Sequence, residues 1–311
     1  MTDKIAIGVD IGGSHINCCA LDVKSNSLLK ETQTIIKVDG HAEAKVILQK
    51  WGEALRATIR KAKDKELIGI GFAMPSPFDY SNGIGKFELV DKFENLNNVD
   101  IQEELRNVLS LDISIPIRFI NDATAFALGE SYFGQGKEFK KVAVITLGTG
   151  FGSAFINENV PVVTGETVPE YGCVWHLPFK EDIADAYFST RWFVNEYEKL
   201  TEKKMDGVKP IADLADTNPE ANKLFKTFGT NLAEFISPYL NQFNTDALVM
   251  GGNITGAFSL FEQILKDGLI QSGLDITISL STLKEDAAIF GSTCLLDSEL
   301  WKGIEPTLKY M

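Results

Sequence analysis

Three short glycine tracts, each following a β-like apolar run, constrain the fold and chemistry of this chain most strongly. They are residues 10–14 (DIGGS), 147–152 (LGTGFG) and 249–253 (VMGGN). Glycine lets backbone N–H groups approach an anion closely, and it adopts the positive φ of the turns that aim them. One such tract is weak evidence, because glycines after strands are common for conformational reasons alone. Three in order, with Asn121 and Asp122 ending another strand between the first two, predict a nucleotide site around a catalytic base.

The composition favours a soluble enzyme of the cytoplasm. The chain has 311 residues, 44% of them hydrophobic, which is enough for two domains with cores. Its net charge of −13, without a stripe of Lys or Arg, argues against nucleic acid or an anionic membrane surface as partner. No apolar run approaches the ~20 residues of a membrane span. We expect no signal peptide, because a strand begins at Ile5.

The four cysteines show no spacing typical of a disulfide framework. They are Cys18, Cys19, Cys173 and Cys294. Adjacent Cys18 and Cys19 would face opposite sides of a strand, so they cannot pair with each other there. We therefore expect reduced thiols.

The order of the expected elements favours two α/β domains. A strand at 5–10, a glycine turn and a strand at 16–21 open the chain, and helical and strand patterns alternate after them. The second half repeats this plan with strands at 142–147 and 153–156 around the second glycine tract. The repetition suggests an ancient duplication, and we expect mixed sheets flanked by helices on either side of a central cleft.

The first glycine tract superficially matches a dinucleotide fingerprint, but that motif must open a helix. Here a strand follows, and no Walker sequence G-x-x-x-x-G-K-[ST] is present. The tract is therefore predicted to be a hairpin whose Gly12, Gly13 and Ser14 bind phosphate, with Asp10 holding Mg²⁺ through water. The alternative is an ordinary Gly-Gly hairpin with an exposed Asp10.

The other two tracts are predicted to bind the rest of ATP. Gly148, Thr149 and Gly150 add hydroxyl and amide donors for the other phosphates. Gly251 and Gly252 have no side chains, as expected where adenine or ribose lies against the backbone. The alternative for Gly251 and Gly252 is a close strand-to-helix turn.

Asn121 and Asp122 lie where a strand gives way to a helix. Both residue types are good helix N-caps, and a cap is the alternative interpretation. A carboxylate at this place can also accept the proton of a hydroxyl that attacks a phosphoryl group. The glycine tracts favour the second interpretation, with Asp122 as general base.

The chain resembles the ROK (repressor, open reading frame, kinase) family of sugar kinases. Residues 10–14 resemble the family's D-x-G-G-T, 121–125 its N-D-A-N-A and 147–152 its L-G-T-G-x-G. Residues 249–253 are similar to its V-x-G-G, and 285–291 to its C-terminal D-A-x-x-x-G helix. The resemblance runs nearly from end to end.

The resemblance implies a two-domain actin-like ATPase (ribonuclease H-like) fold, with residues 1–121 plus about 290–311 in a small domain and 122–289 in a larger one. It implies ATP with Mg²⁺, Asp122 as base and Asn121 on the sugar hydroxyls. The candidate sugar-binding residues are Ser76, Asn95, Asn121, Asp122, Glu170, Cys173 and Asp185.

Several departures from the family pattern fall in one segment. Family members carry G-E-x-G-H and then a cysteine cluster that binds structural zinc. Here Cys173 stands in the place of the His, no cysteine follows up to Asp185, and Asp185 replaces a Glu. His176 and Cys173 cannot fill four tetrahedral positions, so no structural zinc is expected. The family's His touches the hydroxyls near C1 and C2, so its replacement bears on sugar specificity.

The expected activity is ATP-dependent phosphorylation of a hexose, with the 6-OH of glucose as acceptor. The enzymatic alternatives are N-acetylmannosamine, mannose or fructose as acceptor, and polyphosphate as donor. A sugar-sensing repressor is disfavoured, because the phosphate hairpin begins at Ile5 and leaves nothing before it to hold DNA. A non-catalytic sugar-binding protein is disfavoured by the presence of Asp10 and Asp122. A homodimer is possible on family grounds.

Overall fold

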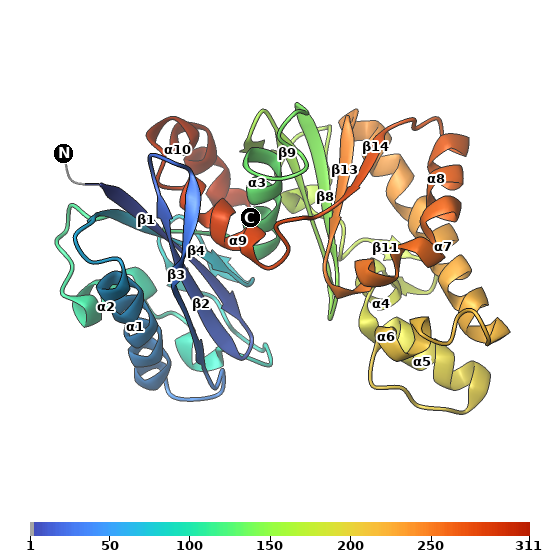
Figure 1. Cartoon of the computed structure of the whole chain (residues 1–311), viewed down its shortest axis with the longest axis horizontal. Coiled ribbons are helices and arrows are strands. Elements are labelled where there is room, and N and C mark those ends of the chain that lie inside the picture. The colour runs from blue at the N-terminus through green and yellow to red at the C-terminus, as the bar shows by residue number, and fades with distance from the viewer. Residues whose placement is uncertain (1–2) are drawn as a thin grey trace. The chain divides into compact units, whose positions relative to one another are not determined.

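The computed structural model describes residues 3–311, which form two compact units. The first unit holds the chain up to Gly134, Asn159–Pro161 and Glu285–Met311, and the second holds Gln135–Glu158 and Val162–Lys284. The C-terminal helices, red in Figure 1, thus belong to the same unit as the blue N-terminal sheet.

The first unit is built on a five-stranded sheet in the order β3-β2-β1-β4-β7. Strands β1, β2 and β3 pair antiparallel, whereas β1, β4 and β7 run parallel. The strands are β1 (Lys4–Gly12), β2 (His15–Asp22), β3 (Ser27–Lys37), β4 (Glu66–Met74) and β7 (Ile117–Asn121), with the short β5 (Phe78–Asp79), β6 (Ile84–Gly85) and β10 (Val160–Pro161) outside this sheet.

Helices and short 3₁₀ segments complete the first unit. In helix α1, Ile47, Trp51 and Leu55 are fully buried and form the apolar face that their spacing predicts. The segments are α1 (Ala44–Lys61), η1 (Glu94–Leu96), α2 (Ile101–Leu109), α3 (Asp122–Tyr132), α9 (Asp286–Cys294), α10 (Ser298–Ile304) and η4 (Glu305–Tyr310).

Helices α3 and α9 pack unusually closely. A Cβ atom added to Gly291 would lie 1.7 Å from the carbonyl oxygen of Ala125, and one added to Gly129 would lie 2.0 Å from that of Ala287. The two helices therefore touch backbone to backbone, which requires glycine at both positions. This contact explains why α3 belongs to the first unit, although the boundary expected from the sequence placed residues 122–134 in the second domain.

We expect Gly291→Ala to destabilise the protein, because its methyl group would meet backbone atoms that cannot move independently. Overpacking of this kind costs about 1–3 kcal/mol of unfolding free energy. Urea denaturation followed by circular dichroism measures it. Gly256→Ala is the control, since a Cβ there has no neighbour within 4 Å. Equal midpoints for the two variants would contradict the close packing of α3 and α9.

The second unit repeats the strand plan of the first. Strands β8 and β9 form an antiparallel hairpin, and β13 and β14 continue the sheet in parallel with β8. The strand order of this sheet is β10-β9-β8-β13-β14, with β8 (Lys141–Leu147), β9 (Phe151–Asn157), β13 (Ala247–Gly251) and β14 (Thr277–Leu280), and β11 (Pro178–Phe179) and β12 (Asp182–Ile183) form a separate ribbon. The two hairpins that the sequence predicts are thus confirmed.

Helices pack around an aromatic core in the second unit. Phe188, Phe193 and Phe228 are fully buried at its centre. The segments are η2 (Glu170–Gly172), α4 (Ala184–Tyr187), α5 (Thr190–Thr201), α6 (Val208–Ala212), α7 (Pro219–Phe243), η3 (Asn253–Leu260) and α8 (Glu262–Gln271). Of the helices formed by residues 3–311, none is long and apolar enough to cross a membrane.

Candidate active site

The carboxyl ends of β1, β4 and β7 bring four predicted site residues to one edge of the first sheet. Because these strands are parallel, residues that follow them lie side by side. The strand register places Asp10 one position before the level of Asn121. Ser76 comes two residues after the end of β4, and Asp122 begins α3 directly after β7.

Asn121 both caps helix α3 and holds the residues beside it. Its Oδ1 accepts the N–H of Thr124 at 3.1 Å, so the N-cap interpretation is correct. Its Nδ2 donates to Ser76 Oγ and to Asp122 Oδ1, each at 3.1 Å. The Ser76 hydroxyl lies 3.0 Å from that of Tyr80. The cap therefore also orients the Asp122 carboxylate.

The Asp122 carboxylate is buried and is held by several hydrogen bonds. The N–H of Ala123 (2.8 Å) and the amide of Asn121 both donate to its Oδ1. Burial raises the pKa of Asp122, and these hydrogen bonds partly oppose the rise. A carboxylate with a raised pKa accepts a proton more readily than an ordinary one.

Asp10 lies close enough to Asp122 for their charges to interact. Burial, and then the negative charges of Asp122 and Glu285, raise the pKa of Asp10 to about 7. Such a concentration of negative charge is relieved by a cation, and Mg²⁺ prefers carboxylate oxygen or water held by it. The residues at this edge thus fit the magnesium that the sequence predicts beside Asp10.

The first glycine tract forms the turn of the β1–β2 hairpin, as expected. The pairing continues to Gly12 and His15, where the turn begins. A Cβ atom at Gly13 would lie 2.7 Å from the Nζ of Lys92, so the bare turn leaves room for this ammonium group. Lys92 is not among the residues predicted from the sequence, and it adds a positive charge at the predicted phosphate hairpin. Nothing in its local sequence indicates this position.

The second glycine tract forms the turn of the β8–β9 hairpin, and residues outside the hairpin hold it through hydrogen bonds. Thr190 donates its backbone N–H and its hydroxyl to the carbonyl oxygen of Gly148, at 2.7 and 2.9 Å. Asp185 Oδ1 accepts the N–H of Phe151 at 2.7 Å, and its Oδ2 is paired with Arg191. Asp185 therefore fixes the hairpin, and its contact with sugar stays a prediction.

The third tract lies beside the second. Gly251 is level with Thr146 of β8, and a Cβ atom at Gly252 would lie 2.3 Å from the carbonyl oxygen of Leu147. Gly252 also has a φ of +86°, which only glycine adopts freely. The second unit thus brings together two of the three tracts that the sequence assigns to the nucleotide.

Glu170 and Cys173 lie in a loop that continues to His176. The Cys173 Sγ is 3.7 Å from His176 Nδ1. Burial raises the pKa of the Cys173 thiol to about 11, so it is neutral at physiological pH. The backbone N–H of Asp185 donates to the carbonyl oxygen of Trp175 at 3.0 Å. This backbone hydrogen bond joins the segment that holds Cys173 to the start of helix α4, where Asp185 lies.

Asn95 has a different environment from the other candidates of the first unit. Its Nδ2 donates to the carbonyl oxygens of His41 and Ala42, at 3.1 and 3.0 Å. The amide therefore ties η1 to the loop before α1 and forms no part of the Asn121 network. Its role toward sugar stays a prediction.

We predict that the purified protein holds no structural zinc. Among residues 3–311, no group of three or more His, Cys, Asp or Glu side chains is placed to hold a metal ion. Metal analysis should find well below one zinc per chain, since Cys173 and His176 supply only two of the usual four ligands. Stoichiometric zinc that survives dialysis against a chelator would contradict this prediction.

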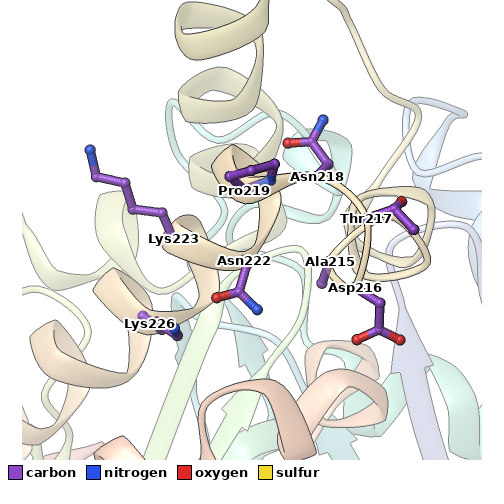
Figure 2. Close-up of a pocket in the computed structure, with 8 residues that line it drawn as sticks. All are labelled: Ala215, Asp216, Thr217, Asn218, Pro219, Asn222, Lys223 and Lys226. Atoms are coloured by element: carbon purple, nitrogen blue, oxygen red, sulfur yellow. The ribbon is translucent and has the colours of Figure 1, made fainter.

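A surface hollow of about 560 Å³ lies at the start of helix α7 (Figure 2). Asn218 Oδ1 accepts the N–H groups of Glu220 and Ala221 there, so the capping donors are satisfied. None of the site residues predicted from the sequence lines it. The lining residues are Ala215, Asp216, Thr217, Asn218, Pro219, Asn222, Lys223 and Lys226.

Several known proteins are similar to this chain over nearly its whole length. A glucokinase of Thermotoga maritima is 23% identical, over 94% of this chain and 98% of that one. The ROK hexokinase of Thermus thermophilus has a TM-score of 0.79 at 18% identity, over 96% and 99% of the two chains. A ROK family glucokinase of Streptomyces griseus, solved with glucose and AMPPNP, has a TM-score of 0.69 at 20% identity, over 94% and 98%.

The structural likenesses confirm the mixed α/β fold of the actin-like ATPase class that the sequence predicts. The family model described as ROK family matches residues 6–299. The match covers far more than half of the sequence, and the chain therefore belongs to the ROK family.

Proposed function

We propose that this protein is an ATP-dependent sugar kinase that phosphorylates the 6-OH of glucose. The observation that carries the proposal is the carboxylate of Asp122, oriented by Asn121 and close enough to Asp10 to interact with its charge. A positioned base next to a second acid is what phosphoryl transfer to a hydroxyl requires. The complex of the Streptomyces griseus relative with glucose and AMPPNP supports both the acceptor and the donor.

In the proposed reaction, the 6-OH of the sugar donates a hydrogen bond to Asp122 Oδ2. As its oxygen forms a bond to the γ-phosphorus, the bond from this phosphorus to the bridging oxygen of ATP breaks. Asp122 takes the hydroxyl proton, and ADP leaves with the electron pair. The raised pKa of Asp122 favours this proton transfer.

The remaining residues would bind the donor. We assign the phosphates to the backbone of Gly12, Gly13 and Ser14 and to the hairpin of Gly148, Thr149 and Gly150, and the adenosine to Gly251 and Gly252. Asp10 would hold Mg²⁺ through water, and the metal would offset the charge that develops on the transferred phosphoryl group. The Lys92 ammonium group at the first turn would also offset negative charge on the phosphates.

The acceptor and the donor can be tested together in one assay. ADP release should be measured with ATP over glucose, mannose, fructose and N-acetylmannosamine, and sugar phosphate formation with polyphosphate as the only donor. We expect glucose with ATP to give the highest kcat/KM. A higher value for another sugar, or for polyphosphate, would replace that part of the proposal. Failure of every sugar would leave a sugar-binding protein without kinase activity.

Two further points belong to this proposal. ATP is abundant in the cytoplasm, so we place the enzyme there. A homodimer stays a prediction that the mass of the protein in solution can test.

A further inference from the structure

The turn of the β8–β9 hairpin is open to solvent and has few neighbours. Thr149 and Gly150 are exposed. Among residues 3–311, no atom lies within 4 Å of a Cβ atom added to Gly148, and one added to Gly150 would have Asp185 Oδ1 as its neighbour, at 3.0 Å. A turn with two glycines and few contacts has much conformational freedom of its own. Its shape therefore depends on the residues that hold it from outside the hairpin.

Asp185 and Thr190 hold the two ends of this turn. The Asp185 carboxylate accepts the N–H of Phe151, where strand β9 begins, at 2.7 Å. Thr190 donates its backbone N–H and its hydroxyl to the carbonyl oxygen of Gly148, which directly follows strand β8. Asp185 lies in helix α4 and Thr190 begins helix α5, so one short segment of chain holds both ends of the turn.

The backbone of Asp185 is fixed independently of its side chain. Its N–H donates to the carbonyl oxygen of Trp175 at 3.0 Å, and the N–H of Ala184 donates to that of Leu177 at 2.9 Å. The start of helix α4 therefore keeps these two bonds when the Asp185 side chain is replaced. A substitution of Asp185 thus tests the contacts of its carboxylate.

The carboxylate of Asp185 is engaged on both of its oxygens. Oδ1 accepts the N–H of Phe151, and Oδ2 is paired with the guanidinium group of Arg191. A carboxylate beside a turn that binds phosphate would repel the phosphate unless a cation compensated its charge, and Arg191 supplies that cation. This arrangement suits a residue that holds the turn better than one that binds sugar hydroxyls.

We propose that Asp185 and Thr190 are positioning residues for the phosphate donor, and that Asp185 serves this purpose in place of the sugar contact predicted from the sequence. The inference rests on the proposed function and deepens it, because it assigns Asp185 to the donor. A turn that is already held in its binding shape loses less conformational freedom when the phosphates of ATP bind, which raises the affinity. Loss of the Asp185 carboxylate should therefore weaken nucleotide binding and leave sugar binding unchanged.

The test measures the two affinities separately by isothermal titration calorimetry. One probe is AMPPNP with Mg²⁺, and the other is glucose without nucleotide, or a better acceptor if the sugar assay identifies one. Asp185→Ala should bind AMPPNP about tenfold to a hundredfold more weakly than the wild type, the range for a lost hydrogen bond to a charged group. Its sugar affinity should equal that of the wild type, which a sugar ligand or a merely damaged fold would not allow.

Further variants grade the effect. Asp185→Asn should recover most of the AMPPNP affinity, because its amide oxygen can still accept the N–H of Phe151. Thr190→Val should weaken AMPPNP binding only about twofold to tenfold, the range for one neutral hydrogen bond, since its backbone N–H still holds Gly148.

Asp182→Ala is the matched control. Asp182 belongs to the same unit and also accepts one backbone N–H, that of Ile183 at 2.7 Å, but this partner lies outside the turn. Both affinities should be unchanged in this variant. Circular dichroism checks that each variant is folded, and Thr190→Val decides the outcome if Asp185→Ala does not fold.

The possible failures are distinguishable. Wild-type protein that does not bind AMPPNP would overturn the proposed function and this inference with it. Binding by the wild type that neither Asp185→Ala nor Thr190→Val weakens would overturn this inference alone. Loss of sugar affinity in Asp185→Ala, with normal AMPPNP affinity, would identify Asp185 as a sugar ligand and would also overturn it.

Discussion

The substitution Asp122→Asn is expected to lower kcat by about 10²–10⁴-fold, the usual contribution of a positioned general base. The amide keeps the shape of the carboxylate and can still bind near the start of α3, but it cannot take the proton of the acceptor hydroxyl. Sugar affinity should change little, because Asn121 and Glu170 remain. Single-turnover kinetics with saturating ATP and sugar would measure the chemical step.

A matched control exists in the same unit. Asp100 caps helix α2 by accepting the N–H of Glu103 at 2.8 Å and has no place in the site. Asp100→Asn should leave kcat unchanged, since asparagine caps helices equally well. If Asp122→Asn also turned over at a near-normal rate, Asp122 would be a helix-start residue only and the proposed mechanism would be wrong.

The substitution Asp10→Asn is expected to make the protein more stable and less active. Folding raises the pKa of Asp10 to about 7 from an ordinary value of 3.8. The contribution of the Asp10 carboxyl to the unfolding free energy therefore falls as the pH rises from about 4 to 7 and stays low above pH 7. Asparagine removes this loss. In EDTA at pH 8, the unfolding free energy of the variant should therefore exceed that of the wild type by about 2–4 kcal/mol, and the difference should become smaller toward pH 4.

The kinase activity of Asp10→Asn should fall, although its stability rises. Loss of a carboxylate that holds a metal through water typically weakens metal affinity about 10–100-fold, so Asp10→Asn should need correspondingly more Mg²⁺ for half-maximal rate. Asp22→Asn is the contrasting control, because hydrogen bonds from Ser25 and Lys65 lower the pKa of Asp22 and its replacement should reduce stability. An unchanged Mg²⁺ requirement in Asp10→Asn would contradict the role assigned to Asp10.

Local patterns were sufficient to predict the hairpins and the sheet edge. Gly12–Gly13 and Gly148–Gly152 lie between apolar runs that alternate as strands do, so the turns followed from backbone chemistry. Asn121 and Asp122 were placed correctly at a strand end, because a buried strand followed by a helix is visible in the sequence. These features depend on neighbours in the chain.

Features that depend on distant neighbours could not be predicted in the same way. The assignment of α3 to the first unit rests on Gly291, which is more than 150 residues away from it in the chain and meets it backbone to backbone. The contact of Lys92 with Gly13 and that of Asp185 with Phe151 also join segments that share no pattern. Candidate site residues can therefore be predicted from local sequence, whereas the partners that hold them cannot.

The central claim is that the protein transfers the γ-phosphoryl group of ATP to a sugar hydroxyl, and direct identification of the product tests it best. The wild-type protein, ATP, Mg²⁺ and glucose should be followed by ³¹P NMR and mass spectrometry. We predict a phosphate monoester on the 6-oxygen of the sugar, formed in step with ADP and absent with Asp122→Asn. Release of ADP with inorganic phosphate and no sugar phosphate would contradict the account.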